Sequence, residues 1–316
     1  MKTLLISVTV ICSLVLAGIY LFIPSKINFS KVAIIKTRIN IANRFLLDES
    51  NWRKWFPADS PGNLPTGNDK NTYRYKNYVY SVEKKMMNAA SVSISNRQIL
   101  LESLITMISM NGDSIAIEWK SNMPASSNPV ERIRNYISAR KLHNNMSDIL
   151  THLQTFLAKS ENVYGIHLHE IISKDSTLVT TRDITTGYPS TTDIYNLIAS
   201  LKKYISSKGA KENNFPMLSV KKVNDTTFET MVAIPVNKYL EDSGTVLYRR
   251  FVPWKVLTAE VKGGDYTVNE ALDQMAIYMN DYQVQGMALP FASLVTDRSK
   301  QADTLQWVTR IYTPIP

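Results

Sequence analysis

Hydrophobic and polar positions near the end of the chain predict a strand, a turn and an amphipathic helix. The strand covers Thr245–Lys262, is rich in β-branched and aromatic residues and is bent by Pro253. Gly263-Gly264 ends it, and either Asp265 or Thr267 can cap the helix that follows. Helical spacing places one apolar stripe on that helix: Leu272, Met275, Ala276 and Met279.

Two short β-rich runs, Leu289–Val295 and Trp307–Ile315, complete this unit, and the residues before it repeat the same order. The earlier copy consists of a strand, a helix and two further strands: Leu178–Thr185, Thr191–Ser207, Phe215–Val220 and Phe228–Val236. Such self-similarity indicates an internal duplication. We expect two strand–helix–strand–strand units about a pseudo-twofold axis, with both helices on one face of a joined sheet and a groove at the axis.

Residues 164–316 resemble the GyrI-like small-molecule-binding domain, also called the AraC-type effector-binding domain. The matching residues include Gly244-Thr245-Val246, Gly264-Asp265-Tyr266, Pro290, Thr296-Asp297 and Trp307–Ile315. The resemblance implies a central groove for hydrophobic, often cationic, molecules. Some family members are regulators, and a few hydrolyse their ligand.

One position departs from that family's pattern. The family carries Pro-aromatic-Glu-x-Tyr, whereas this chain has Ala292 at the Glu and Leu294 at the Tyr. A groove without the buried carboxylate loses its attraction for cations and its obvious general base. We therefore expect no catalytic residue and no cofactor, although the sequence leaves enzymatic activity open.

The N-terminal segment 3–23 is uncharged over a length that could cross a bilayer as a helix. We expect residues 1–24 to form a single-pass transmembrane anchor with the following domains outside the cytoplasm. A cleaved signal peptide is the alternative, but the apolar run is long and lacks a clear cleavage site. Cys12, the only cysteine, lies in this segment, so a disulfide or cysteine metal site elsewhere is excluded.

The pattern of elements over residues 25–160 predicts a separate unit. A strand over Ile27–Arg38 precedes a helical segment, four β-like runs follow between residues 72 and 120, and a long helix covers Val130–Lys159. Ser127 or Asn128 can cap this helix, Pro129 suits its first turn, and Asn144-Asn145 can interrupt it.

This order resembles the helix-grip fold of the SRPBCC superfamily, the polyketide cyclase/dehydrase-like group. The resemblance rests on the apolar N-terminus, on Ile23-Pro24-Ser25-Lys26 and on the run from Leu47 to Trp55, which contains Asn51-Trp52 and Trp55. Domains of this group wrap a sheet around the long helix and enclose an apolar cavity. Membrane-anchored bacterial members show the same N-terminal order.

Charge adds little to this picture. The 316 residues carry a formal net charge of +9, but the lysines and arginines are scattered in pairs and no helix-turn-helix is evident. A scattered basic surface explains this charge without a nucleic-acid site, so we expect no nucleic-acid partner. Regulators of the GyrI-like family carry a DNA-binding domain at the place that residues 25–160 occupy here.

Five aromatic residues are candidates for ligand contact: Tyr188, Trp254, Tyr266, Phe291 and Trp307. Each has a packing role as its alternative, most clearly Phe291 and Trp307. His167-x-His169 projects two imidazoles from one strand face but has no evident third ligand, so no metal is expected. Glu229 and Glu260 could replace the missing family Glu, although solvent-facing strand positions suit them better.

The sequence thus predicts a membrane-anchored α+β protein with a helix-grip domain over residues 25–160 and a GyrI-like domain over 164–316. The expected function is non-catalytic binding of a hydrophobic small molecule or lipid in one or both cavities. The alternatives are a hydrolase or cyclase acting on a hydrophobic metabolite and a protein-interaction scaffold at the membrane.

Overall fold

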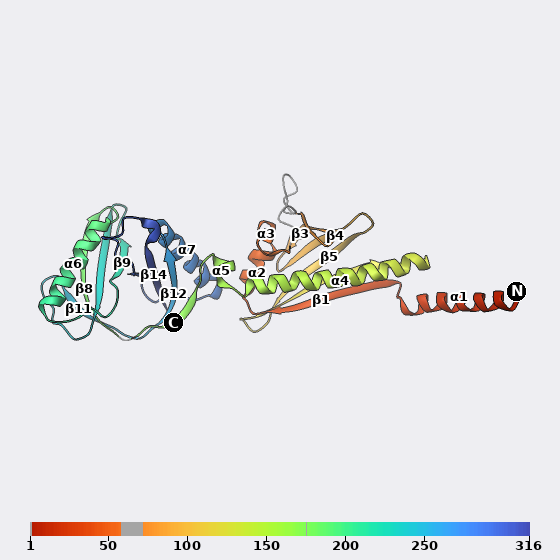
Figure 1. The fold of residues 1–316 in the computed structure, drawn as a ribbon, viewed down its shortest axis with the longest axis horizontal. Coiled ribbons are helices and arrows are strands. Elements are labelled where there is room, and N and C mark those ends of the chain that lie inside the picture. Colours follow the sequence, from red (N-terminus) through yellow and green to blue (C-terminus); the bar gives the residue numbers. More distant parts are fainter. Residues whose placement is uncertain (1, 58–71, 175) are drawn as a thin grey trace. The chain divides into compact units, whose positions relative to one another are not determined.

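The computed structural model describes residues 2–57, 72–174 and 176–316 (Figure 1). The chain divides into two compact units, Met1–Val163 and Tyr164–Pro316. Each unit contains one antiparallel sheet, with six strands in the first and eight in the second. Helices and sheets are both present in each unit, so the expected α+β class is confirmed.

The sheet of the first unit has the strand order β1-β6-β5-β4-β3-β2. Its strands are β1 (Lys26–Ile35), β2 (Thr72–Tyr75), β3 (Tyr78–Met86), β4 (Ala89–Ser95), β5 (Leu100–Ser109) and β6 (Ile115–Pro124). The helices are α1 (Lys2–Phe22), α2 (Ile39–Leu46), a 3-10 turn (Glu49–Asn51), α3 (Trp52–Trp55), α4 (Pro129–Leu157) and α5 (Ser160–Tyr164).

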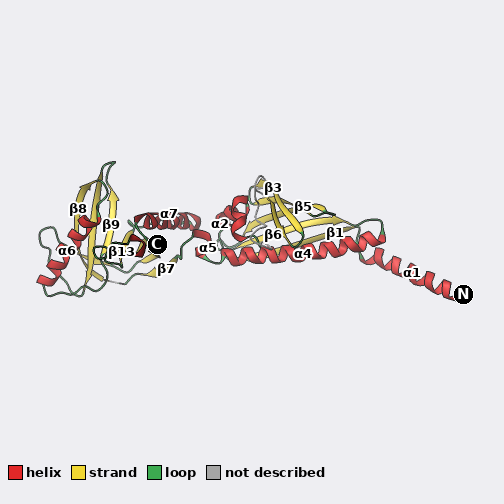
Figure 2. Ribbon diagram, turned by 45° about the horizontal axis from the view of Figure 1, so that its top comes forward, coloured by secondary structure: helices red, strands yellow, loops and turns green. Residues whose placement is uncertain are grey.

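The long helix α4 runs beside β1 and packs on this sheet (Figures 1 and 2). Asn128 caps it, because its Oδ1 accepts hydrogen bonds from the backbone N–H groups of Val130 and Glu131 at 2.9 and 3.3 Å. The helix continues through Asn144-Asn145 without the break that the sequence allowed. The stripe that faces the sheet includes Leu142, Met146, Ile149 and Leu153, all buried.

The helix α1 occupies the segment for which a transmembrane anchor was expected. A span requires about 20 consecutive, mainly apolar residues. Within the part of the chain that the structure describes, no helix combines the length and apolar character needed to cross a membrane, so the expected anchor is not supported. At its end, the Arg132 Nε–H of α4 donates to the Ile23 carbonyl at 2.9 Å.

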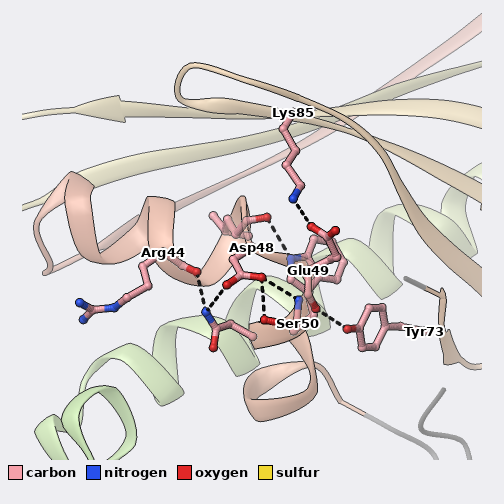
Figure 3. A network of polar contacts seen from close by, with 9 residues as sticks. Arg44, Asp48, Glu49, Ser50, Tyr73 and Lys85 are labelled. Atoms are coloured by element: carbon pink, nitrogen blue, oxygen red, sulfur yellow. Dashed lines mark hydrogen bonds and ion pairs between the residues drawn. The ribbon is translucent and has the colours of Figure 1, made fainter. Parts of the chain in front are cut away.

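The Trp-x-x-Trp segment holds α2 and α3 together. The indole N–H groups of Trp52 and Trp55 donate to the carbonyls of Leu46 and Phe45 at 3.0 and 2.9 Å. Figure 3 shows the polar network beside it, in which Glu49 pairs with Lys85 of β3 and its carbonyl accepts from Tyr73 of β2. These contacts attach the helical segment to the sheet, so the packing role of the two tryptophans accounts for the motif.

The interior of the first unit is filled with aromatic side chains. Trp52, Tyr80 and Trp119 are fully buried. Phe56 packs on Trp52, Tyr73 and Tyr80 at ring distances of 5.3 to 5.6 Å, and Tyr80 meets Trp119 at 5.8 Å. The Trp119 indole N–H donates to Ser103 Oγ at 2.9 Å. Large aromatic rings therefore fill this part of the interior.

The sheet of the second unit has the strand order β11-β8-β10-β9-β13-β14-β12-β7. Its strands are β7 (His169–Ile172), β8 (Ser176–Thr186), β9 (Met217–Lys222), β10 (Thr227–Val236), β11 (Leu247–Phe251), β12 (Lys255–Lys262), β13 (Phe291–Leu294) and β14 (Val308–Ile315). Its helices are α6 (Thr191–Ser207), α7 (Asp265–Tyr282) and a 3-10 turn (Thr304–Gln306).

The strand order is symmetric about the contact between β9 and β13. One side contains β8, α6, β9 and β10, and the other contains β12, α7, β13 and β14. The two halves exchange their edge strands. β7, which precedes β8 in the chain, pairs with β12 of the other half, and β11, which precedes β12, pairs with β8. The single strand expected over Thr245–Lys262 is therefore wrong. Pro253, which lacks a backbone N–H, separates β11 from β12, and the two strands join opposite sides of the sheet.

Both helices cover the same face of this sheet. The core under α6 contains Ile198, Leu218 and Leu294. Leu272 of α7 lines a hollow together with Ala292. Ala292 lies two residues before Leu294 on β13, so the two side chains point to the same face of the sheet. Ser190 and Asp193 form a capping box at α6. At α7 the N-cap is Gly264, which makes no side-chain bond, so neither Asp265 nor Thr267 has the expected capping position.

Candidate functional site

A hollow of about 170 Å³ lies where the two halves of the second unit meet. We call it the groove. The apolar part of its lining comes from β9, β13, β14 and α7, and consists mainly of Leu218, Val220, Leu272, Phe291, Ala292 and Ile311. Its polar lining includes Tyr188, Asp265 and Arg298. The groove therefore combines an apolar floor with a few polar groups, as small-molecule sites usually do.

Ala292 is central to the groove. It lies opposite Leu218 of β9 and Ile311 of β14 in the sheet register, so the two halves of the unit meet at this residue. The side chain is half-buried and ends at its methyl group. The space that a longer side chain would take at this position remains part of the hollow.

Tyr188 precedes α6 and lines the groove beside the start of α7. Its ring meets Phe228 edge-on at 5.7 Å, and 54% of the residue is exposed. Partial removal from water raises the pKa of its hydroxyl, the negative charge of Asp265 adds to the rise, and Arg298 opposes it. Tyr188 thus remains a neutral hydrogen-bonding group near one acidic and one basic side chain.

Arg298 is the buried cation of this site, and only 7% of its side chain is exposed. Its Nη1 donates to Asp265 Oδ1 at 3.0 Å, and its Nη2 donates to Thr309 Oγ1 at 2.8 Å. The guanidinium carbon lies 4.6 Å from the centre of the Trp307 ring. Its backbone N–H donates to the Tyr195 hydroxyl of α6 at 2.6 Å. Arg298 therefore joins the two helices of the unit.

The sequence did not single out Arg298. It follows Thr296-Asp297, which stand out only through a family resemblance, and its loop has no periodic pattern of apolar residues. A buried arginine is uncommon, but burial of a loop residue depends on tertiary contacts. The residues that bury it, Asp265, Trp307 and Thr309, lie elsewhere along the chain.

Of the five residues predicted to contact a ligand, two line the groove and three do not. Tyr188 and Phe291 line the groove. Trp307 is buried against Arg298, donates its indole N–H to Gln301 O at 2.8 Å and is not among the groove residues. Tyr266 is 80% exposed and Trp254 is half-buried, and neither is among the groove residues. Trp254 instead exchanges two hydrogen bonds with Ser173 through its backbone.

Two further hollows each share one lining residue with the groove. One, of about 440 Å³, is on the helix-free face, where Phe291 packs between Phe251 at 5.7 Å and Tyr312 at 5.0 Å. The other, of about 1170 Å³, lies beside α6 and is lined partly by paired charges such as Lys202 and Glu212, 3.1 Å apart. Arg298 lines both this hollow and the groove.

The remaining candidates from the sequence are not part of the groove. His167 and His169 lie side by side with ring centres 5.2 Å apart. Within residues 2–57, 72–174 and 176–316, no group of three or more acidic, His or Cys side chains could hold a metal ion. Glu229 and Glu260 pair with Arg182 and Arg310 at 3.1 and 2.7 Å, so neither takes the place of the absent family Glu.

No family model and no curated protein matches the chain. Among solved structures, the EcmrR–DNA complex shares 15% identity and a TM-score of 0.44, covering 60% of this chain and 72% of that chain. SAV2435 bound to tetraphenylphosphonium shares 15% identity and a TM-score of 0.32, covering 48% and 94%. A START superfamily protein from Mycobacterium smegmatis shares 12% identity and a TM-score of 0.27, covering 40% and 92%. At these identities and scores the likenesses carry no argument about ligand or activity, and the expected absence of a nucleic-acid partner stays a prediction.

Proposed function

We propose that this protein binds a small, mainly apolar molecule in the groove of its second unit without changing the molecule chemically. The observation that carries the proposal is the position of Ala292. It leaves a hollow at the meeting point of β9, β13 and β14, between aliphatic and aromatic walls. Transfer of an apolar ligand from water into such a hollow is favourable. The volume is close to that of an apolar cavity that accepts one aromatic ring.

The fold assignment that accompanies this function is also a proposal. The symmetric strand order and the two helices on one face support a GyrI-like domain for the second unit. A six-stranded antiparallel sheet with one long helix packed on it supports a helix-grip domain for the first. A fold alone does not fix a ligand, so the function rests on the groove itself.

We assign ligand binding to the second unit because the interior of the first is occupied. Trp52, Tyr80 and Trp119 are each fully buried there. A ligand would have to displace these rings, which are closely packed. The groove requires no such displacement.

Binding without chemistry is favoured by the charges that line the groove. Its two ionised side chains are Asp265 and Arg298, and they pair with each other. A general base must reach a substrate proton with a free lone pair. One oxygen of the Asp265 carboxylate is held by the guanidinium, and Ala292 offers no functional group. Asp265 is therefore the one carboxylate in the lining of the groove, and its ion pair with Arg298 favours a binding role over hydrolysis or cyclisation.

The test uses a neutral fluorescent probe, 2-naphthylmethanol, and the full chain. Ala292→Phe fills the hollow, whereas Ala276→Phe adds the same ring on the exposed face of α7. We expect Ala292→Phe to weaken binding at least about tenfold and Ala276→Phe to leave it unchanged, since filling a cavity removes the contact area of the ligand. Equal affinity in all three proteins, or no binding to any, would overturn the proposal.

A second measurement seeks the natural ligand. Native mass spectrometry of the gently purified protein should reveal an added mass that is lost on denaturation. Ala292→Phe should carry less of this mass than Ala276→Phe. A mass that both variants retain equally would place the ligand outside the groove.

A further inference from the structure

We propose that the ligand of the groove carries an acidic group, a carboxylate or a phosphate, and that Arg298 binds this group. The inference rests on the proposed binding function and names the chemical class of the ligand. Ala292 lines the groove with a methyl group and so brings no charge to it. The cationic side chain in the lining of the same groove is Arg298. Arg298 is therefore the charged group of this lining that an acidic ligand would meet.

The first argument is that the guanidinium has unused hydrogen-bonding capacity. An arginine side chain has five N–H groups. Within the part of the chain that the structure describes, Arg298 donates through Nη1 to Asp265 and through Nη2 to Thr309, and its buried Nε has no acceptor. A buried charge is costly unless it is paired and hydrogen-bonded. An additional acceptor on a ligand would reduce that cost.

The second argument concerns the asymmetry of the ion pair. The side chain of Asp265 is 54% exposed and that of Arg298 is 7% exposed. Water therefore screens the negative charge more strongly than the positive one. The pair also has a single contact, Nη1 to Oδ1 at 3.0 Å, in place of the two-point contact that would occupy the guanidinium fully. A net positive potential consequently remains in the groove.

The third argument is that Arg298 is held rigidly. Trp307 supports the guanidinium at 4.6 Å, Thr309 accepts from Nη2 at 2.8 Å, and Tyr195 accepts from the backbone N–H at 2.6 Å. Planar guanidinium groups recognise carboxylates and phosphates through paired hydrogen bonds. Because the orientation is already fixed, little side-chain entropy is lost when an acid binds.

The experiment compares probes that share one naphthalene ring system and differ in charge. They are 2-naphthoate, 2-naphthyl phosphate, 2-naphthylmethanol and 2-naphthylmethylammonium, each titrated into the full chain at neutral pH. We expect the better of the two acids to bind about tenfold more tightly than the alcohol, and the ammonium to bind less tightly than the alcohol. Comparing the two acids identifies the preferred group.

Variants separate recognition from packing. Arg298→Met should reduce the affinity of the acid to that of the alcohol. Asp265→Asn, which keeps Arg298 and removes its competitor, should raise the affinity for the acid. Arg310→Met is the matched control, because Arg310 lies on the same strand as Thr309 and pairs with Glu260 outside the groove. It should leave the order of the probes unchanged.

Two results would overturn the inference. If neither acid binds the unaltered protein more tightly than the alcohol does, the groove has no preference for an acidic ligand. If Arg298→Met does not fold, Asp265→Asn still decides, since an unchanged affinity for the acid shows that Arg298 does not contact it. Failure of all four probes would instead overturn the proposed binding function, which keeps the two failures distinguishable.

Discussion

The guanidinium carbon of Arg298 lies 4.6 Å from the centre of the Trp307 ring, and both residues are buried. A cation over an aromatic face is stabilised by the ring's quadrupole, and more so where water is excluded. This contact joins the loop that follows β13 to the start of β14. It also supports the one basic side chain that lines the groove. The packing of Trp307 and the chemistry of the groove are thus connected.

Replacing Trp307 by leucine should therefore destabilise the second unit. We expect the free energy of unfolding to fall by about 2–3 kcal/mol, from the smaller apolar side chain and the lost cation–π contact. Urea denaturation followed by circular dichroism measures this change. Trp254→Leu is the control, because Trp254 is only half-buried and its hydrogen bonds come from the backbone. Equal losses in the two variants would contradict the supporting role of Trp307.

Introducing a carboxylate at Ala292 should reverse the charge preference of the groove. We expect Ala292→Glu to bind 2-naphthylmethylammonium about five- to tenfold more tightly than Ala292→Gln does. The two variants have side chains of similar size, so their comparison isolates the charge. Fluorescence titration gives both affinities. If Ala292→Glu shows no advantage over Ala292→Gln, position 292 does not face the ligand.

The hydrogen bond between Trp119 and Ser103 should matter for the first unit. Both residues are buried, and Ser103→Ala leaves the indole N–H without its acceptor. An unsatisfied buried donor costs about 1–3 kcal/mol in the free energy of unfolding. Ser93→Ala on the neighbouring strand, where the serine is half-exposed, should cost less. Comparable urea midpoints for the two variants would argue against the importance of this bond.

Glu49 should make the first unit sensitive to acid. Its hydrogen bond with Lys85 holds the pKa of the carboxyl below its ordinary value of 4.5, although burial opposes the shift. Because the folded pKa is depressed, this stabilisation is complete above pH 4.5 and is lost as the pH falls through the lowered pKa. Lys85 is 46% exposed, so the contribution should be below about 1 kcal/mol.

Urea midpoints measured between about pH 7 and pH 3 check this pH dependence. The Glu49→Gln variant should show a shallower fall in the midpoint as the pH decreases. Glu83→Gln, at an exposed position of the same sheet, should behave like the unaltered protein. A curve for Glu49→Gln that matches the curve for Glu83→Gln would show that the ion pair is not responsible.

The sequence predicted local features more accurately than distant pairings. The bounds of α6, Thr191–Ser207, follow from the spacing of Ile194, Ile198, Leu201 and Ile205, which are buried in the structure. Asn128 and Pro129 likewise fix the start of α4 within a few residues. Helical periodicity, caps and the β-rich runs of strands are properties of neighbouring residues, and the α+β class was predicted from these local patterns.

The departures have a different physical origin. Val252-Pro253-Trp254 could be a bend within one strand or a crossing between two, and only the partners β8 and β14 decide. Tyr266 corresponds to Tyr188 in the sequence, yet Tyr188 lines the groove and Tyr266, which is 80% exposed, does not. Arg298 becomes buried through residues that are distant in sequence, so no local pattern could identify it. Tertiary contacts determined each of these outcomes.

The exchange of edge strands in the second unit has a consequence for how it unfolds. β7 and β11 each complete the half of the sheet to which they do not belong by sequence, through their pairing with β12 and β8. Neither half can detach while these pairs hold, because each would take the other's outer strand with it. We therefore expect the halves to lose their structure in one cooperative step. The spacing between the walls of the groove is then a property of the native state as a whole, so this site should select molecules by fit and not by closing around them.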